Sequence, residues 1–547
     1  MPRERYGLWL LAAALLCGGL RDPRLAALGE AGIFALVWLE RPALGPAAVW
    51  LPWLVWAYLA SMLSLQPLAA VSSLARWSAV LAFGSLAAMW GEREAWLKTL
   101  VVLAVILAAA ALWTGAAGGF HAAMTGLIPP YYNYTSFALA AGSAAAAAWA
   151  LHPRAGRPSI RIAGLAAAAV GVGCLALAHS RGAVLGLAVA AAVWSLRRWG
   201  AKAGWVMLVG AGLAAGASRA NLVPDSWRAA LAKRGVYQEA RPQIWSRAAA
   251  IADEQPWFGA GPGGFGAAFR RRPVEVLGGR ARWGMGTEYA HSEIFQAAAE
   301  TGWAGLALWL TGLGASFSVL FRRARAEPAR EAAAIAVAAM AIPLAVDNML
   351  QIPGLALLFF SAVAVAGENP SGGRRWPRAA ALAGGLLALT AWIPRALAEG
   401  NPSRAAALFP AESEPREDLG SQALIAGRNA EADAFFAEAE RLSPFNAVYP
   451  WRRAQIAAAQ GHWADAERFS GRAAALEPGF LNDRVLRAQA LDRLGRTRDA
   501  RDELAAVLLL SRQRGHRPGS SGYDDTVWNF DEKEYDRADA SIGGPKR

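Results

Sequence analysis

Long apolar segments joined by short polar loops fill roughly the first 400 residues of the sequence. A helix needs about 20 mostly apolar residues to cross a membrane, where its backbone must satisfy its own hydrogen bonds. The pattern therefore predicts an all-α, polytopic transmembrane bundle of about twelve to thirteen spans. The thirteen candidate spans lie near 6–20, 25–39, 46–63, 69–90, 95–115, 134–151, 161–179, 182–196, 204–218, 302–321, 331–346, 352–366 and 378–395.

Composition supports a membrane protein and argues against several other classes. The chain has 547 residues, of which 55% are hydrophobic, which is too apolar for a soluble protein of this length. Its formal charge of +13 lies largely in short loops between spans, where lysine and arginine set topology, so we predict no nucleic-acid partner. The two cysteines, Cys17 and Cys174, both fall inside apolar segments and predict neither a disulfide framework nor a zinc site.

The loop charges give an orientation. Basic connections on one side of the membrane are expected to be cytoplasmic, together with the N-terminus. Alternation of the spans then places the long loop 219–300 on the outer side, along with the chain after about residue 396. The basic loops are 152–161, 196–204, 321–330 and 372–378.

The long polar interval at 241–306 breaks the apolar pattern. It opens with a predicted helix whose apolar face carries Ile244, Ala248, Ile251 and Ala252 and which Pro256 ends, because proline disfavours helical geometry before it. A turn dense in glycine follows, where the backbone can bend tightly or approach a ligand closely. The interval then leads through His291 into another helix at the edge of an apolar span.

Three motifs in this interval carry a resemblance to a known family. They are Arg-x-x-x-Trp from Arg241, Pro-Trp-Phe-Gly-x-Gly-x-Gly-x-Phe from Pro256, and Ala-His-x-x-x-Phe-Gln-x-x-x-Glu-x-Gly from Ala290. Their order and spacing resemble the O-antigen ligase and O-antigen polymerase superfamily over roughly 160–310. The resemblance implies a bacterial inner-membrane glycosyltransferase that uses polyprenyl-pyrophosphate-linked glycans. It also implies that the 219–300 loop and the active site are periplasmic.

The resemblance indicates three catalytic residues. Ser180-Arg181-Gly182 lies between two spans with almost no loop, and with Arg241 the Arg181 guanidinium would hold the pyrophosphate of the donor. His291 would accept the proton of the attacking hydroxyl or orient it. The alternatives are an arginine that reaches to lipid headgroups, an ordinary surface arginine and a structural histidine.

Four further residues are predicted to bind substrate. Arg247 is the reserve for Arg241, and Ser180 adjoins Arg181. Asn133 and Tyr132, ahead of the sixth span, are candidates for a sugar path, although tyrosines at a membrane interface are an equally good interpretation. The outer loops contain no Asp-x-Asp pair or His/Cys cluster, so we predict no metal ion and no cofactor.

The chain beyond the last span changes character. Gly427, Gly461 and Gly495 are 34 residues apart, as are Ala432, Ala466 and Ala500. A 34-residue period resembles the tetratricopeptide repeat, which pairs helices into a surface for a protein or glycan. We therefore predict a glycosyltransferase domain at 1–395, a periplasmic repeat domain at 396–511 and a disordered tail at 512–547. A repeat domain that only stabilises the membrane part is the alternative.

The predicted function is transfer of a glycan from undecaprenyl pyrophosphate to an acceptor hydroxyl, such as that of lipid A-core. The partners are this lipid-linked glycan, an acceptor glycolipid or glycan, membrane lipids and a protein partner for the repeats. An O-antigen polymerase and a protein O-oligosaccharyltransferase share the same pattern and stay open. From other classes, a transporter or flippase and a non-catalytic scaffold also stay open; a transporter predicts charges paired at mid-membrane in broken helices.

Overall fold

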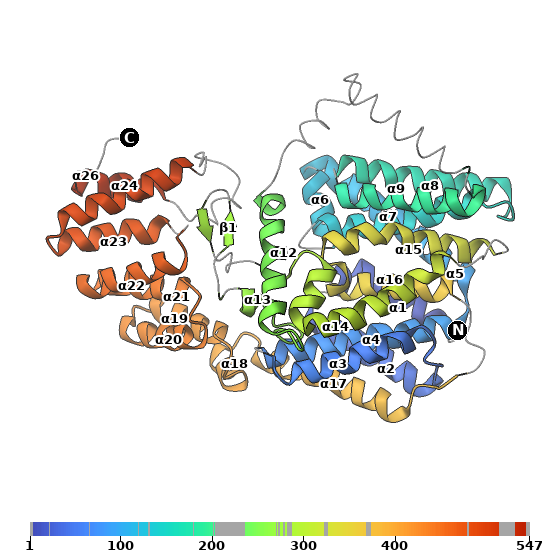
Figure 1. The fold of residues 1–547 in the computed structure, drawn as a ribbon, viewed down its shortest axis with the longest axis horizontal. Coiled ribbons are helices and arrows are strands. Elements are labelled where there is room, and N and C mark those ends of the chain that lie inside the picture. The colour runs from blue at the N-terminus through green and yellow to red at the C-terminus, as the bar shows by residue number, and fades with distance from the viewer. Residues whose placement is uncertain are drawn as a thin grey trace, which may run out of the picture. The chain divides into compact units, whose positions relative to one another are not determined.

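The structure, a computed structural model, is built almost entirely of helices (Figure 1). It forms two compact units: the first is 1–233, 252–263 and 290–392, and the second is 234–251, 264–289 and 393–547. The structure describes residues 4–20, 22–64, 66–118, 120–128, 132–178, 180–200, 202, 236–269, 271, 274–276, 279–281, 287–321, 327–367, 373–478, 481–513 and 531–542.

The first unit confirms the predicted all-α, polytopic class. Every predicted span coincides with a helix except 204–218, which lies outside the described residues. These helices are α1 (Glu4–Leu16), α2 (Pro23–Glu40), α3 (Leu51–Ser61), α4 (Pro67–Trp90), α5 (Arg93–Gly118), α7 (Tyr132–Ala150), α8 (Pro158–Leu177), α9 (Arg181–Trp199), α14 (Glu293–Phe317), α15 (Pro328–Val346), α16 (Pro353–Ala366) and α17 (Arg378–Ala398). The sequence did not predict α6 (Phe120–Leu127), and short 3-10 turns lie at Gly18–Leu20, Gly45–Trp50, Ser318–Leu320 and Met349–Gln351.

Within the part that the structure describes, five helices are long and apolar enough to cross a membrane: α4, α5, α8, α14 and α15. In the apolar stretch of α15 that could cross a membrane, 72% is buried inside the protein, whereas only 28% of the corresponding stretch of α8 is buried. The exposed part of α8 is apolar, with Ile162 67% exposed, and an apolar outer face is suited to lipid. The chain is therefore a multi-pass membrane protein.

Helix α15 lies at the centre of the first unit, packed against α7, α9 and α16 (Figure 1). Its sequence is rich in alanine, and small residues let neighbouring backbones approach closely within a membrane. Gly186 of α9 shows how close this approach is, because an added Cβ there would overlap the Ala339 carbonyl of α15. Small residues at these contacts thus hold α7, α9 and α15 together.

Described residues at the edges of three of the basic loops lie near one end of this bundle. His152, just after α7, pairs with Glu331 at the start of α15 over 3.3 Å. Near the same end, Arg197 donates to the Leu320 carbonyl, and Arg93 pairs with Glu327. The opposite ends of α7, α9 and α15 carry the polar residues of the candidate site. A helix of 19 residues such as α7 is about 28 Å long, so the two groups are separated by about one membrane thickness.

The second unit contains α12 (Val236–Glu254), α13 (Phe265–Phe269), a two-stranded hairpin of β1 (Val274–Val276) and β2 (Gly279–Ala281), and a series of paired helices. The pairs are α19 (Glu414–Ile425) with α20 (Asn429–Leu442), α21 (Val448–Ala459) with α22 (Trp463–Leu476), and α23 (Leu481–Arg493) with α24 (Thr497–Gln513); α18 (Pro402–Leu408) precedes them.

The second helix of each pair begins 34 residues after the one before, at Asn429, Trp463 and Thr497. The three phased glycines end the first helices in left-handed backbone, with φ between 73° and 78°, as glycine permits. The three phased alanines, Ala432, Ala466 and Ala500, are completely buried. The helical pairs thus repeat with the predicted period, while their assignment to the tetratricopeptide family stays a prediction.

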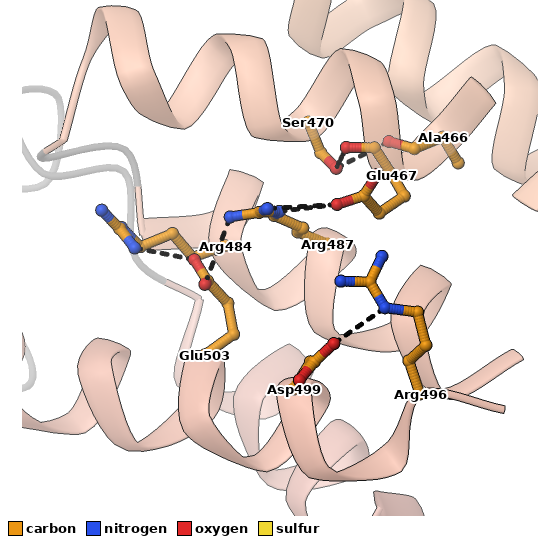
Figure 2. Close-up of polar contacts among 8 residues, drawn as sticks. All are labelled: Ala466, Glu467, Ser470, Arg484, Arg487, Arg496, Asp499 and Glu503. Atoms are coloured by element: carbon orange, nitrogen blue, oxygen red, sulfur yellow. Dashed lines mark hydrogen bonds and ion pairs between the residues drawn. The ribbon is translucent and has the colours of Figure 1, made fainter. Parts of the chain in front are cut away.

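Ion pairs between neighbouring helices recur with the same period. Arg453 of α21 binds Asp433 of α20 at 2.8 Å, and 34 residues later Arg487 of α23 binds Glu467 of α22 at 3.1 Å. Figure 2 shows Arg487 between Glu467 and Glu503, next to the Arg484–Glu503 pair. These contacts fix how each pair of helices packs on the next.

The predicted disorder from 512 to 547 is wrong for part of this range. Helix α24 continues to Gln513, and residues Glu532–Ile542 form helix α26, which packs on α23 and α24. Tyr535, Ala538 and Ile542 fall on one face of α26 and are buried against the last repeat. The polar composition hid this face, because its three buried residues stand among charged ones.

We expect Asp483→Asn to stabilise α23 at neutral and alkaline pH. Burial holds the pKa of Asp483 well above its usual value, nearby Glu477 raises it further, and Arg484 opposes them. Because the pKa of Asp483 is higher in the folded state, its protonated form contributes its full stability at pH values below the unfolded-state pKa. This contribution is lost as the pH rises through the folded-state pKa. Hydrogen exchange of α23 in the full chain should slow in the variant at pH 8, because the free energy of unfolding of this helix rises by about 1–3 kcal/mol.

The variant and wild type should match near pH 4. The control is Asp465→Asn, whose exposed carboxylate pairs with Arg468 and should leave exchange unchanged. Equal exchange of α23 in wild type and Asp483→Asn at pH 8 would contradict the assignment.

Candidate functional site

A polar break separates two apolar helices at the site end of the first unit. Helix α15 ends at Val346 and α16 begins at Pro353, with a single 3-10 turn at Met349–Gln351 between them. Asp347 and Asn348 in this break are 4% and 0% exposed. Irregular backbone at membrane depth is tolerated where the protein satisfies its polar groups, and here side chains from other helices do so.

Asp347 connects the predicted site residues. Its Oδ1 accepts a hydrogen bond from the Asn348 backbone N–H at 3.0 Å and lies 3.4 Å from the Nδ1 of His291. Its Oδ2 accepts from the Nδ2 of Asn133 at 2.9 Å. The Oδ1 of Asn133 in turn accepts from the Ser180 hydroxyl at 3.2 Å. His291, Asn133 and Ser180 are therefore brought together by one carboxylate.

His291 has an unusual backbone. Its φ is +50°, in the left-handed region that is uncommon for residues other than glycine. The next residue, Ser292, begins α14, where its hydroxyl accepts from the Phe295 N–H at 3.5 Å. Backbone strain of this kind is concentrated at functional sites, because the surrounding structure must maintain it.

A carboxylate beside the Nδ1 of a histidine favours the tautomer that carries its proton on that nitrogen. The Nε2 is then a base, and the carboxylate stabilises the imidazolium that forms when it accepts a proton. Asp347 is placed for this role toward His291, whose side chain is 9% exposed. The 3.4 Å separation is long for a hydrogen bond, as is common before a substrate completes a site.

Arg181 is the first residue of α9, directly after Ser180. The start of a helix carries a partial positive charge that adds to that of the guanidinium. Tyr132 is the first residue of α7, next to Asn133, and is half-buried. Arg181 and Tyr132 are thus joined through their chain neighbours to the Asp347 network.

Arg241 and Arg247 lie on α12, in the second unit. The predicted apolar face of this helix is confirmed, since Ile244, Ala248, Ile251 and Ala252 are all buried, and the helix ends at Glu254, before Pro256. Arg247 is 7% exposed and Arg241 is half-buried. The roles of both arginines toward the donor stay predictions.

Other polar residues close to the candidate site in sequence have different roles or positions. Tyr134 is buried and accepts a hydrogen bond from the Nδ2 of Asn348 at 2.8 Å, so it supports the break. Glu300 accepts from the Nε2 of Gln296 at 2.8 Å, a contact within α14. Tyr131 and His179 lie outside the described residues.

The glycine-dense turn packs against helices of its own unit. Gly259 has a φ of +61°, and an added Cβ would lie 2.5 Å from the Ala299 carbonyl oxygen of α14. Helix α14 is kinked at Gly302, which has a φ of 71° and a ψ of 178°. The Ala260 N–H donates to the Ala299 carbonyl at 2.8 Å, and the Trp56 indole donates to the Thr301 carbonyl at 3.1 Å. The close backbone approach predicted for this turn is therefore an approach to α14.

Asp347 was not predicted from the sequence motifs. The signal was present, because Asp-Asn-Met-Leu-Gln at 347–351 puts three polar residues between two apolar spans. Among the described residues, no group of three or more His, Cys, Asp and Glu is placed to hold a metal ion. Chemistry without a metal ion stays a prediction.

The fold and the network define a class: a multi-pass, all-α membrane protein with a buried histidine–carboxylate contact at one end of its helices. Residues 165–310 match the family model described as O-antigen ligase, and this match supports the O-antigen ligase superfamily that the motifs predicted. No curated protein matches the chain. The matched segment contains Ser180, Arg181 and His291, and Asn133 and Asp347 lie outside it. The chain is an enzyme of the general glycosyltransferase kind found in this family.

Proposed function

We propose that the chain transfers a glycan from a polyprenyl pyrophosphate, such as undecaprenyl pyrophosphate, to the hydroxyl of an acceptor glycolipid such as lipid A-core. The observation that carries the proposal is the contact of His291 with Asp347, because it supplies an oriented base within a family of O-antigen ligases. We also propose an inner-membrane location with this site on the periplasmic side, since the described edges of the basic loops at 152–161, 196–204 and 321–330 lie at the opposite end of the helices.

The proposed step forms one bond and breaks one. The acceptor oxygen attacks the anomeric carbon of the donor from the face opposite the pyrophosphate, while the Nε2 of His291 takes the hydroxyl proton. The bond from the anomeric carbon to the pyrophosphate oxygen breaks, and polyprenyl pyrophosphate leaves with the bonding electrons. The configuration at the anomeric carbon is thereby inverted.

Arg181 and Arg241 are proposed to bind the pyrophosphate and stabilise the charge that grows as it leaves. Guanidinium is planar, always charged and suited to bidentate phosphate contacts. Such stabilisation is strong where water is excluded. Arg247, Tyr132, Asn133 and Ser180 are proposed to help hold donor or acceptor, and the repeats of the second unit to bind a protein partner.

The test is an assay of the purified protein with polyprenyl-pyrophosphate glycan and either lipid A-core, a protein acceptor or no acceptor. We expect glycan to appear on lipid A-core only when that acceptor is present. Chain growth without an acceptor would instead make the protein a polymerase, and transfer only to protein would make it a protein oligosaccharyltransferase. Absence of transfer in all three would contradict a glycosyltransferase.

A further inference from the structure

A second buried carboxylate, Glu293, lies two residues after His291. It is 1% exposed, and both of its carboxylate oxygens accept hydrogen bonds from the polar break after α15. Its Oε1 accepts from the Leu350 backbone N–H at 2.6 Å, and its Oε2 accepts from the Nε2 of Gln351 at 3.0 Å. The break is short of regular helical hydrogen bonds, so Glu293 supplies an acceptor that the backbone there needs.

Gln351 extends this contact to a third helix. Its Oε1 accepts from the Nη2 of Arg76 on α4 at 2.7 Å, and its backbone carbonyl accepts from the Nη1 of the same arginine at 3.2 Å. The Arg76 Nη2 also donates to the Ser73 hydroxyl at 3.2 Å. Arg76, Gln351 and Glu293 thus form a chain from α4 through the break to the start of α14.

The same two segments meet at two places. His291 faces Asp347 over 3.4 Å, and Glu293 binds Leu350 and Gln351. The first contact is long and joins a strained residue to an irregular segment, so by itself it constrains the pair weakly. The second contact consists of two short hydrogen bonds, and Gln351 is also bound by Arg76 of α4.

We propose that Glu293 is a positioning residue that holds the 347–351 break against the start of α14 and thereby fixes Asp347 beside His291. This inference rests on the proposed function of His291 as the base. Glu293 acts through Asp347, because both of its oxygens are occupied by the break. A shift of about 1 Å in the carboxylate would turn the imidazole or release its tautomer, and displacements of that size can cost about a hundredfold in rate.

The Glu293–Gln351 pair allows a test by exchange of the two side chains. In Glu293→Gln, two amide NH₂ groups face each other across the contact, because the Gln351 oxygen is held by Arg76. In Gln351→Glu, two carboxylates face each other. In the double variant, Gln at 293 donates to Glu at 351, which still accepts from Arg76, so every hydrogen bond and the net charge are restored.

We expect each substitution alone to lower kcat about 10- to 100-fold with KM within about twofold of wild type. The exchanged double variant should return to within about threefold of the wild-type kcat. The matched control is Glu331→Gln, which removes a carboxylate with 4% exposure at the far end of α15 and should leave kcat unchanged. Full activity of Glu293→Gln, or a double variant as slow as the single ones, would overturn the inference.

A spectroscopic measurement keeps the inference separate from the proposed function. Nitrogen-15 shifts of the imidazole of His291, assigned by the signal lost in His291→Ala, report the tautomer without any substrate. We expect the Nδ1–H form in wild type, a mixture of tautomers in Glu293→Gln and the Nδ1–H form again in the double variant. Unchanged shifts in Glu293→Gln would refute the positioning role, whereas a wild-type protein that transfers no glycan would refute only the proposed function.

Discussion

Replacing His291 by alanine is expected to lower the rate of glycan transfer at least about 100-fold without loss of folded protein. General base catalysis by a placed side chain contributes about 10²- to 10⁴-fold, and alanine removes the base and its contact with Asp347. Asp347→Asn should have a smaller effect, about 10- to 100-fold, because the amide keeps the size of the side chain and loses the charge that stabilises the imidazolium.

The measurement is kcat for glycan transfer by equal amounts of each folded variant in detergent or vesicles. His462→Ala is the control, since His462 precedes α22 in the second unit, is exposed and should transfer at the wild-type rate. Wild-type activity in His291→Ala would remove the histidine from the chemistry, and wild-type activity in Asp347→Asn would remove the carboxylate.

Replacing Gly302 by alanine is expected to prevent accumulation of the folded protein. A φ of 71° with a ψ of 178° belongs to a region that essentially only glycine adopts, at a cost of about 1–3 kcal/mol for another residue. An added Cβ would also lie 2.5 Å from the Pro256 carbonyl oxygen, and overpacking of this kind typically costs about 1–3 kcal/mol more. Together these are a large share of the stability of a domain, about 5–15 kcal/mol.

Thermal unfolding and the yield of monodisperse protein measure this effect. The matched control is Gly314→Ala in the same helix, where an added Cβ meets nothing within 4 Å. That variant should unfold at or slightly above the wild-type temperature, because alanine favours a helix. A Gly302→Ala protein as stable as wild type would show that the turn and α14 do not touch as described.

The sequence predicted the helices of this fold well for physical reasons. Spans are set by length and hydropathy, which the sequence displays directly, and the 34-residue period is marked by glycines that must end helices. Helix α26 was missed because its apolar face consists of Tyr535, Ala538 and Ile542 among charged residues. A short face of this kind is recognised only once the last repeat is present to cover it.

The candidate site was predicted only in part. The motifs identified His291, and the polar position ahead of the sixth predicted span identified Asn133, which the structure joins to His291 through Asp347. Asp347 itself stands in a short polar break, and the sequence cannot show that the break folds back onto the start of α14. The contact between Glu293 and Gln351 depends on the same fold-back, since the two residues are 58 positions apart in sequence.

The central claim is that the His291–Asp347 contact is the centre of glycan transfer from a polyprenyl pyrophosphate. The most direct measurement follows release of polyprenyl pyrophosphate and formation of glycosylated lipid A-core in the same tube, with wild type and His291→Gln at equal concentrations of folded protein. The account predicts that wild type releases one polyprenyl pyrophosphate for each glycan transferred and that both signals fall at least about 100-fold in the variant. Equal rates in the two proteins, or no release by wild type, would contradict it.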